Sequence, residues 1–152
     1  MFSGTYRHQL DDKLRFRIPT ALRGDLGDAP KMIVGFDGYI LIYTGENYKR
    51  FVDDAFENVG VMSEDEEDLM RLIYSRTQPV EMDDQGRVKL DRELAKLVEL
   101  NKNDSIVTLG VGNRIEIWPE KLYDNAKLDA AASAARQRLR EKMSRKNSQS
   151  EQ

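Results

Sequence analysis

The sequence predicts a β-rich α+β fold in which one unit of strands and a short helix occurs twice in tandem. Three observations lead to this prediction: an internal repeat, a two-residue turn signal near the end of each copy, and helical periodicity after each copy. The chain has 152 residues, of which 39% are hydrophobic and 34% charged. That length excludes two large independent domains, and halves of about seventy residues carry little core alone. We therefore expect the copies to share one pseudo-symmetric, β-rich body with helical appendages.

The internal repeat relates residues 10–18 to residues 82–90, which lie 72 positions later. Both segments contain Asp-Asp-x-x-Arg and then alternate basic with apolar side chains. A period of two predicts a strand with one solvent-exposed face. The aspartates and, in the second copy, Gly86 predict a tight turn before that strand, because aspartate tolerates turns and glycine adopts positive φ.

A hairpin is predicted near the end of each copy. Residues 32–43 resemble residues 107–118 at an offset of 75 positions. Each segment carries a two-residue turn signal between β-branched and aromatic residues, Asp37-Gly38 in the first and Gly112-Asn113 in the second. Such dipeptides are the strongest short-range signal for antiparallel strands. Each copy is thus predicted as β-turn-β, a short helix and a β-hairpin.

Helices are predicted within and after the copies. Pro19 in the first turn opens the short helix of the first copy, and Asp91 caps that of the second. Ser63 and Glu66 form a capping box ahead of an apolar stripe, and a long, weakly apolar helix follows the second copy. We divide the chain into a first unit (5–50), acidic connecting helices (51–76), a second unit (77–121), a C-terminal helix (122–146) and a disordered tail (147–152).

The repeated aspartate and arginine admit two interpretations. They can form an ordinary turn, in which an exposed ion pair contributes about 0 to 1 kcal/mol. Alternatively, Asp11 and Asp83 orient Arg15 and Arg87, holding each guanidinium ready for phosphate oxygens or for the O6 and N7 edge of guanine. Two copies at equivalent places favour the second interpretation, because stability alone rarely demands an arginine in a solvent-facing loop.

Local charge supports a DNA-binding role more strongly for the first copy than for the second. Residues 5–24 carry a net charge of +3 and residues 81–98 a net charge of −1, so we expect the first copy to bind more phosphate. The basic run between residues 136 and 146 is compatible with a DNA contact or with a solvated helix end. The predicted DNA-binding residues are Arg15, Arg87, Lys13, Arg17, Lys89 and Arg7.

Composition argues against several other classes of protein. The chain has no cysteine and a single histidine, His8, which we interpret as a surface strand residue rather than a base. No separated set of carboxylates indicates catalysis, so we expect no enzymatic activity, no catalytic residue, no cofactor, no metal and no small-molecule substrate. No apolar run approaches the roughly 18 residues of a membrane span, and the start of the chain lacks an export signal, which predicts a cytoplasmic protein.

The motifs together resemble those of a known family. They are the opening Met1-Phe2-x-Gly4, the segment Leu10-Asp11-x-Lys13-x-Arg15 with Pro19-Thr20 following, and Met82-Asp83-x-x-Gly86-Arg87. Over roughly residues 1–145 the chain resembles the MraZ family of bacterial transcription regulators. The resemblance implies two tandem SpoVT-AbrB units of the swapped-hairpin type, forming a double-psi-like barrel. It also implies a nucleoid-associated regulator, usually a repressor of its own division and cell-wall gene cluster, that binds double-stranded promoter DNA as a closed homo-oligomeric ring.

One position departs from the family pattern: Leu14 stands where the first motif usually has glycine. If that position needs positive φ, leucine costs on the order of 1 kcal/mol, so we expect the first turn to differ in shape from the second. The main alternative function is a structural or protein-interaction ring in which any DNA contact is incidental. A carboxylate-dependent hydrolase is a third hypothesis, which nothing in the motifs favours.

Overall fold

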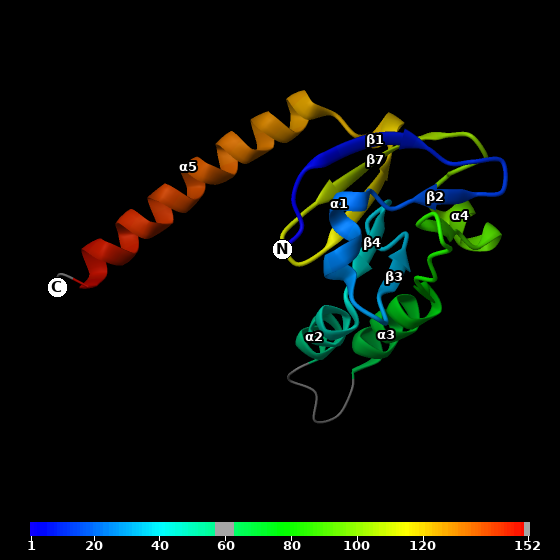
Figure 1. Ribbon diagram of the computed structural model, residues 1–152. Coiled ribbons are helices and arrows are strands. Elements are labelled where there is room, and N and C mark those ends of the chain that lie inside the picture. Colours follow the sequence, from blue (N-terminus) through cyan, green and yellow to red (C-terminus); the bar gives the residue numbers. More distant parts are fainter. Residues whose placement is uncertain (57–62, 151–152) are drawn as a thin grey trace. The chain divides into compact units, whose positions relative to one another are not determined.

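The computed structural model describes residues 1–56 and 63–150 (Figure 1). The chain divides into two compact units, Met1–Glu120 and Lys121–Gln152. The first unit contains the strands, and the second contains the C-terminal helix. Among the helices in the described part of the chain, none combines the length and apolar character needed to cross a membrane.

The first unit is built on an antiparallel sheet with the strand order β1-β7-β8-β4-β3-β5, and a separate ribbon pairs β2 with β6. The strands are β1 (Thr5–Gln9), β2 (Arg15–Arg17), β3 (Lys31–Val34), β4 (Ile40–Tyr43), β5 (Thr77–Pro79), β6 (Arg87–Lys89), β7 (Ser105–Gly110) and β8 (Ile115–Pro119). The two predicted hairpins are confirmed, because β3 pairs with β4 and β7 with β8, although their connections, residues 35–39 and 111–114, are longer than the two-residue turns that the dipeptides indicate. The fold is therefore β-rich with added helices, as predicted.

The two copies exchange strands with each other. β1 begins at Thr5 and β5 begins 72 positions later at Thr77, so the two strands are equivalent in the repeat. β1 pairs with β7 of the second copy, and β5 pairs with β3 of the first. In the ribbon, Phe16 of the first copy lies opposite Val88 of the second. Neither copy completes its own sheet, and both are needed to form the body.

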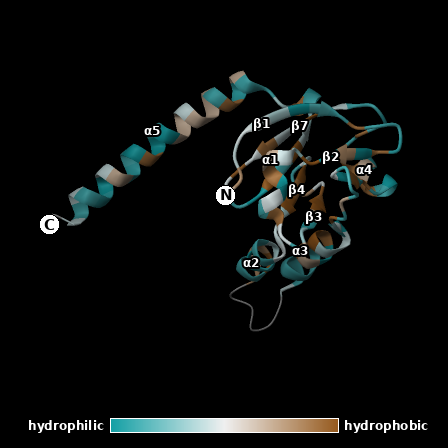
Figure 2. Cartoon of the chain, viewed as in Figure 1, coloured by the Kyte–Doolittle hydropathy of each residue, from teal (hydrophilic) through white to brown (hydrophobic). Residues whose placement is uncertain are grey.

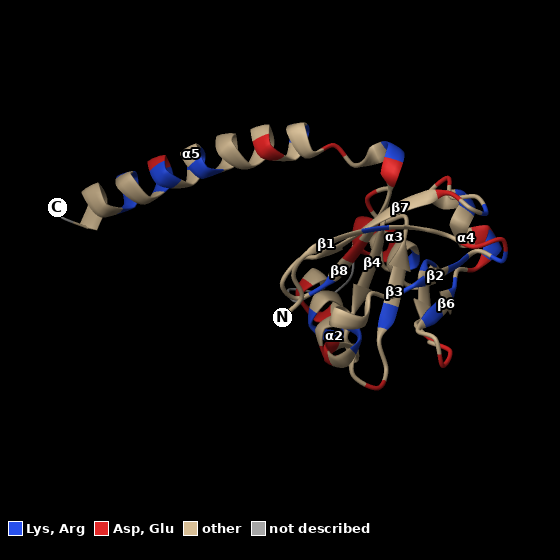
Figure 3. Cartoon of the chain, turned by 45° about the horizontal axis from the view of Figure 1, so that its top comes forward, with Lys and Arg blue, Asp and Glu red and all other residues tan. Residues whose placement is uncertain are grey.

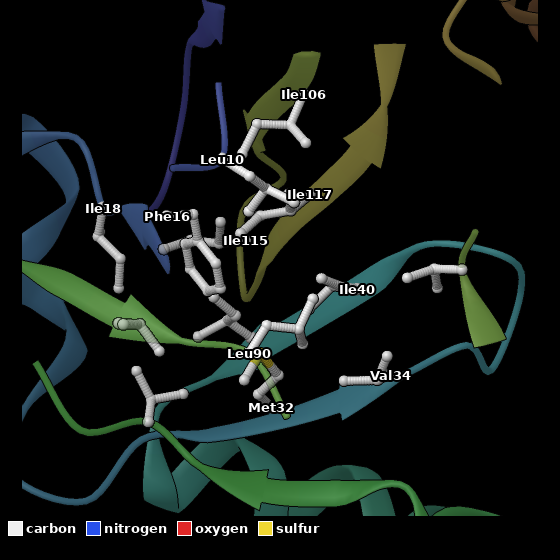
Figure 4. Packing of buried hydrophobic residues seen from close by; sticks show 14 of the residues in the cluster. Leu10, Phe16, Ile18, Met32, Val34, Ile40, Leu90, Ile106, Ile115 and Ile117 are labelled. Carbon is white, nitrogen blue, oxygen red and sulfur yellow. The ribbon is translucent and has the colours of Figure 1, made fainter. Parts of the chain in front are cut away.

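One core serves both copies. Its buried side chains come from β2, β3 and β4 of the first copy and from β6, β7 and β8 of the second. Figure 4 shows Phe16 and Ile18 pointing into the same space as Leu90 and Ile115, and Figure 2 shows the apolar residues concentrated on the central strands. The shared core confirms the prediction that the halves do not pack separately.

The helices are α1 (Thr20–Arg23), η1 (Gly24–Leu26), α2 (Gly45–Ala55), α3 (Glu64–Ser75), α4 (Arg92–Leu97), η2 (Glu120–Leu122) and α5 (Asn125–Ser150). Helices α2 and α3 pack Val52 and Ile73 against the outer face of β3 and β4. The predicted caps at Ser63 and Asp91 are confirmed, since both side chains accept hydrogen bonds from backbone amides of the first helical turn. Pro19, in contrast, lies at the N-cap of α1 rather than inside its first turn.

Two boundaries differ from the division made on the sequence. Helix α2 begins at Gly45, capped by Thr44, whereas the sequence analysis extends the first unit to residue 50. Helix α5 continues through residues 147–150, which the sequence analysis assigns to a disordered tail. That segment contains no glycine or proline, so nothing in it stops an established helix from propagating. The rest of the predicted tail, and residues 57–62 of the connecting segment, lie outside the described residues.

Candidate nucleic-acid interface

The first candidate loop runs from Asp11 to Arg15 and is closed by the aspartate carboxylate. Asp11 Oδ1 accepts hydrogen bonds from the amides of Lys13 (2.9 Å) and Arg15 (2.8 Å), and Asp11 Oδ2 accepts one from Arg15 Nε (2.6 Å). The backbone closes the same turn, because the Asp11 amide donates to the Arg15 carbonyl at 2.9 Å. One carboxylate therefore fixes both the turn and the guanidinium that follows it.

The second loop, from Asp83 to Arg87, repeats this geometry. Asp83 Oδ1 accepts from the amides of Gln85 and Arg87, both at 2.9 Å, and Asp83 Oδ2 accepts from Arg87 Nε at 2.7 Å. The Asp83 amide donates to the Arg87 carbonyl at 2.9 Å. The arginine side chains have similar exposed fractions, 25% for Arg15 and 30% for Arg87. The repeated motif therefore corresponds to a repeated structure.

Both loop carboxylates are stabilised in the charged form. Burial alone would raise the pKa of Asp11, but hydrogen bonds from the Arg15 and Lys13 amides and from the Arg15 guanidinium hold it below its ordinary value. The backbone hydrogen bond from Arg87 is the main cause that lowers the pKa of Asp83. Each arginine is thus held by an ionised partner over the neutral pH range.

The prediction that the two turns differ in shape is wrong. Leu14 has φ of 57° and the equivalent Gly86 has φ of 75°, so both turns use the left-handed region at the same position. Leucine is retained there because its side chain is partly buried against the core, which offsets the backbone cost. At Gly86 the matching space is filled by Arg23: a Cβ added at this glycine would lie 2.2 Å from Arg23 Cζ.

The ribbon of β2 and β6 brings the two loops together. Its register places Arg15 opposite Lys89 and Arg17 opposite Arg87. Because the intervening Phe16 and Val88 are buried, all four basic side chains lie on the outer face of the ribbon. Figure 3 shows β2 and β6 side by side with basic residues along both. Asp11 and Asp83 offset the charges of Arg15 and Arg87, whereas no ion pair among the described residues involves Arg17 or Lys89, so the outer face of the ribbon keeps positive charge.

Backbone hydrogen bonds and one further arginine tie the loops to each other. The Leu90 amide donates to the Leu14 carbonyl, and the Ile18 amide donates to the Gly86 carbonyl, each at 3.0 Å. Arg23 donates from Nε to the Ile18 carbonyl (2.7 Å) and from Nη2 to the Gln85 carbonyl (3.2 Å). From the sequence, Arg23 is only one of the basic residues that give residues 5–24 their net charge of +3. Its role as a brace depends on contacts between residues far apart in the chain.

The remaining predicted site residues do not all lie on the ribbon or its loops. Lys13 is exposed within the first loop, one residue before Leu14. Arg7 lies on β1, outside the ribbon, and pairs with Glu120 at 3.2 Å. His8 is also on β1, but it is half-buried and bonded to Thr108 Oγ1 at 2.7 Å, so it is not the surface residue expected from the sequence. Of the six predicted DNA-binding residues, the structure thus groups all except Arg7.

In the described ranges 1–56 and 63–150, no group of three or more histidine, aspartate or glutamate side chains is arranged to hold a metal ion.

The fold and the two loops together define a tandem-repeat protein that presents two aspartate-held arginines on one basic ribbon. Arginine held in this way is suited to planar, bidentate recognition of phosphate or of a base edge.

The chain matches a known family along most of its length. The family model described as "MraZ protein, putative antitoxin-like" matches it twice, over residues 1–72 and 73–145. A Mesoplasma florum protein named transcriptional regulator MraZ is 35% identical over 130 residues, which cover 85% of this chain and 87% of that protein. A Ureaplasma parvum protein of the same name is 32% identical over 131 residues, covering 85% and 88%. The chain therefore belongs to the MraZ family.

Proposed function

We propose that this protein is a transcriptional regulator that binds promoter DNA sequence-specifically through the β2–β6 ribbon. The observation that carries the proposal is the pair of equivalent Asp–Arg loops, whose arginines lie on one outer face with Arg17 and Lys89. Arg17 and Lys89, together with the free terminal nitrogens of the two arginines, give this face positive charge and hydrogen-bond donors that a bound polyanion can engage.

The geometry supports base reading in addition to phosphate attraction. Only Nε of Arg15 and of Arg87 is engaged by its aspartate, and in the described part of the chain no hydrogen bond is formed by their terminal nitrogens. These nitrogens supply the paired donors that guanine O6 and N7 accept, a contact that contributes about 1 to 3 kcal/mol of discrimination. A two-stranded ribbon also fits the width of the major groove.

The two loops carry acidic as well as basic side chains. This composition favours DNA recognition through the geometry of the arginines over attraction by a high overall positive charge. Exposed Asp12 and Asp84 lie next to the orienting aspartates and reduce the local positive charge. Arg15, Arg17, Lys13, Arg87 and Lys89 are the proposed contact residues, with Asp11 and Asp83 as positioning residues. Arg7 is a peripheral phosphate contact in this proposal, because its partner Glu120 is exposed and an exposed pair is easily exchanged.

The proposed function also depends on several chains assembling with one another. A chain with net charge −3 and two short loops has limited affinity, so several chains acting together in a closed ring provide the required effective concentration. The exchange of β1 and β5 between copies supports a swapped-hairpin, double-psi-like fold for each chain. We further propose that the ring is cytoplasmic and nucleoid-associated, and that it represses its own division and cell-wall gene cluster.

Footprinting on the DNA upstream of its own gene tests this function. We expect protection of short repeats spaced by about one helical turn, roughly 10 bp. Titration over a range of salt should give a steep log-log dependence of affinity, because bound phosphates release counterions. A structural or protein-interaction ring with incidental DNA contact predicts neither a footprint nor a preference for this DNA over a scrambled duplex.

A further inference from the structure

The C-terminal half of α5 concentrates positive charge on a chain that is otherwise acidic. Residues 136–146 contain six basic side chains and one acidic side chain, Glu141, for a net charge of +5. The whole chain carries −3, so the remaining residues together carry −8. Figure 3 shows the basic residues as successive bands along this part of the helix. The six basic side chains, all exposed, are Arg136, Arg138, Arg140, Lys142, Arg145 and Lys146.

The pairing of these cations differs from that on the other long helices. Exposed Arg50 of α2 bonds Glu46, and exposed Arg71 of α3 bonds Glu67 and Asp68. On α5, by contrast, none of the ion pairs within residues 1–56 and 63–150 involves any of the six cations. The helix also has no buried residue, so packing against a core does not explain its composition.

The cations flank a narrow apolar line from two sides. At 100° per residue, Arg136 and Arg140 project on one side of Leu139 and Met143, while Arg138, Lys142 and Lys146 project on the other. Glu141 faces away from that line. The segment is about 15 Å long, a length over which each strand of a duplex presents about four phosphates. A helix lying in a major groove has a phosphate backbone on either side, which this arrangement of charge matches.

Two other anionic partners fit less well. A lipid surface needs a broad apolar face, yet α5 contains no aromatic residue and its basic half offers only Leu139 and Met143. The acidic first turn of α3 in a second copy, residues 64–68, spans a single turn of helix and meets only one flank of cations.

We propose that the basic half of α5 is a second DNA-binding element, which contacts phosphates of a duplex without reading its sequence. The proposal rests on the DNA-binding function argued above and adds to it a separate, salt-sensitive source of affinity. In this arrangement the ribbon selects the sequence, and α5 contributes affinity that is the same for every duplex.

The test compares full-length variants by their binding to a random-sequence duplex at several salt concentrations. The α5 variant, R136Q/R138Q/R140Q/K142Q, removes four cations and keeps helix propensity, since glutamine is a good helix former. The matched control, K49Q/R50Q/R71Q/K102Q, removes four exposed cations elsewhere and gives the same net charge. If each removed α5 cation neutralises one phosphate, the slope of log affinity against log salt becomes shallower by about 3 to 4.

The expected result is a shallower slope for the α5 variant alone, with the wild-type ratio of affinities for promoter and random duplexes retained. A second arm uses R15A/R87A, which should lose that ratio and keep the α5-dependent slope, so failure of the ribbon proposal is distinguished from failure of this one. An unchanged slope in an α5 variant with wild-type helix content by circular dichroism overturns the proposal.

Two further outcomes also overturn it. One is an altered sedimentation coefficient of the free protein with an unchanged slope, which indicates contact between copies. The other is α5-dependent binding to phosphatidylglycerol vesicles with an unchanged slope, which indicates a lipid partner. A chain ended after Tyr123 provides the same readouts if the substituted helix unfolds, and it too should show the shallower slope.

Discussion

Replacing Asp11 with asparagine tests whether orientation of the arginine matters for DNA binding. Asparagine keeps the oxygen that accepts from the Lys13 and Arg15 amides, so the turn is retained. It replaces Oδ2 with an amide group, which places a donor against the Nε–H of Arg15 where the wild type has a 2.6 Å ion-paired hydrogen bond. The guanidinium is therefore released while the loop stays closed.

The structure indicates a small effect on the fold and a larger effect on recognition. The side chains of Asp11 and Arg15 are 32% and 25% exposed, so loss of their pair should cost at most about 1 kcal/mol. That corresponds to a Tm lowered by no more than about 4 °C. A misdirected arginine loses up to about 1 to 3 kcal/mol of base discrimination, or about 5- to 150-fold in specific affinity per loop. Non-specific affinity should rise, because a negative charge facing phosphate is removed.

Asp12→Asn provides the matched control, because Asp12 is exposed and its substitution removes the same charge while Asp11 still holds Arg15. Binding to promoter and scrambled duplexes at one fixed salt concentration is measured for both variants. We expect Asp12→Asn to raise both affinities, and Asp11→Asn to raise only the non-specific one. If the two variants change both affinities alike, Asp11 does not act by orienting the arginine.

Three further predictions concern the turn, pH and the spacing of sites. In urea unfolding, Leu14→Ala should destabilise the fold by about 1 kcal/mol more than Leu14→Gly, because alanine retains the backbone cost of φ near 57° and glycine does not. Equal losses of stability would show that the turn is unstrained. Burial lowers the pKa of His8 in the folded chain, so below about pH 6.5 the unfolded chain binds a proton that the folded chain does not, and stability should fall. His8→Gln should reduce that fall between pH 7 and the lowered pKa, and an unchanged pH dependence would rule the histidine out as its source. Moving one promoter repeat by about 5 bp should sharply weaken binding, and unchanged affinity would contradict engagement of several loops on one face of the duplex.

Features encoded in short segments could be predicted from the sequence. The Asp–Arg loops, the two hairpins and the caps at Ser63 and Asp91 each depend on residues within a few positions of one another. The repeat added the information that the two loops are equivalent. The structure bears this out in nearly identical hydrogen bonds, with the arginine Nε to aspartate distance at 2.6 and 2.7 Å.

Features that join distant segments could not be predicted from the residues alone. The strand pattern around Arg15 indicates one exposed face, but it does not indicate that Lys89 is the cross-strand neighbour, because the β2–β6 register pairs residues seventy or more positions apart. The brace formed by Arg23 on the Gln85 carbonyl was missed for the same reason. Leu14 shows a different limit: local propensity predicts an altered turn, and contact of its side chain with the core overrides that preference.

The most direct test of the ribbon as the DNA-reading surface is promoter binding by Arg15→Ala/Arg87→Ala. Thermal melts and sizing should show a folded protein with wild-type assembly, since both ion pairs are partly exposed. By comparison, Ile18→Ala removes a side chain that is 1% exposed and should cost about 2 to 5 kcal/mol of stability. At one fixed salt concentration, we predict that the arginine variant loses its preference for upstream DNA over a scrambled duplex. A folded, assembled variant that keeps the wild-type preference would show that the loops are structural turns and that the DNA-reading surface lies elsewhere.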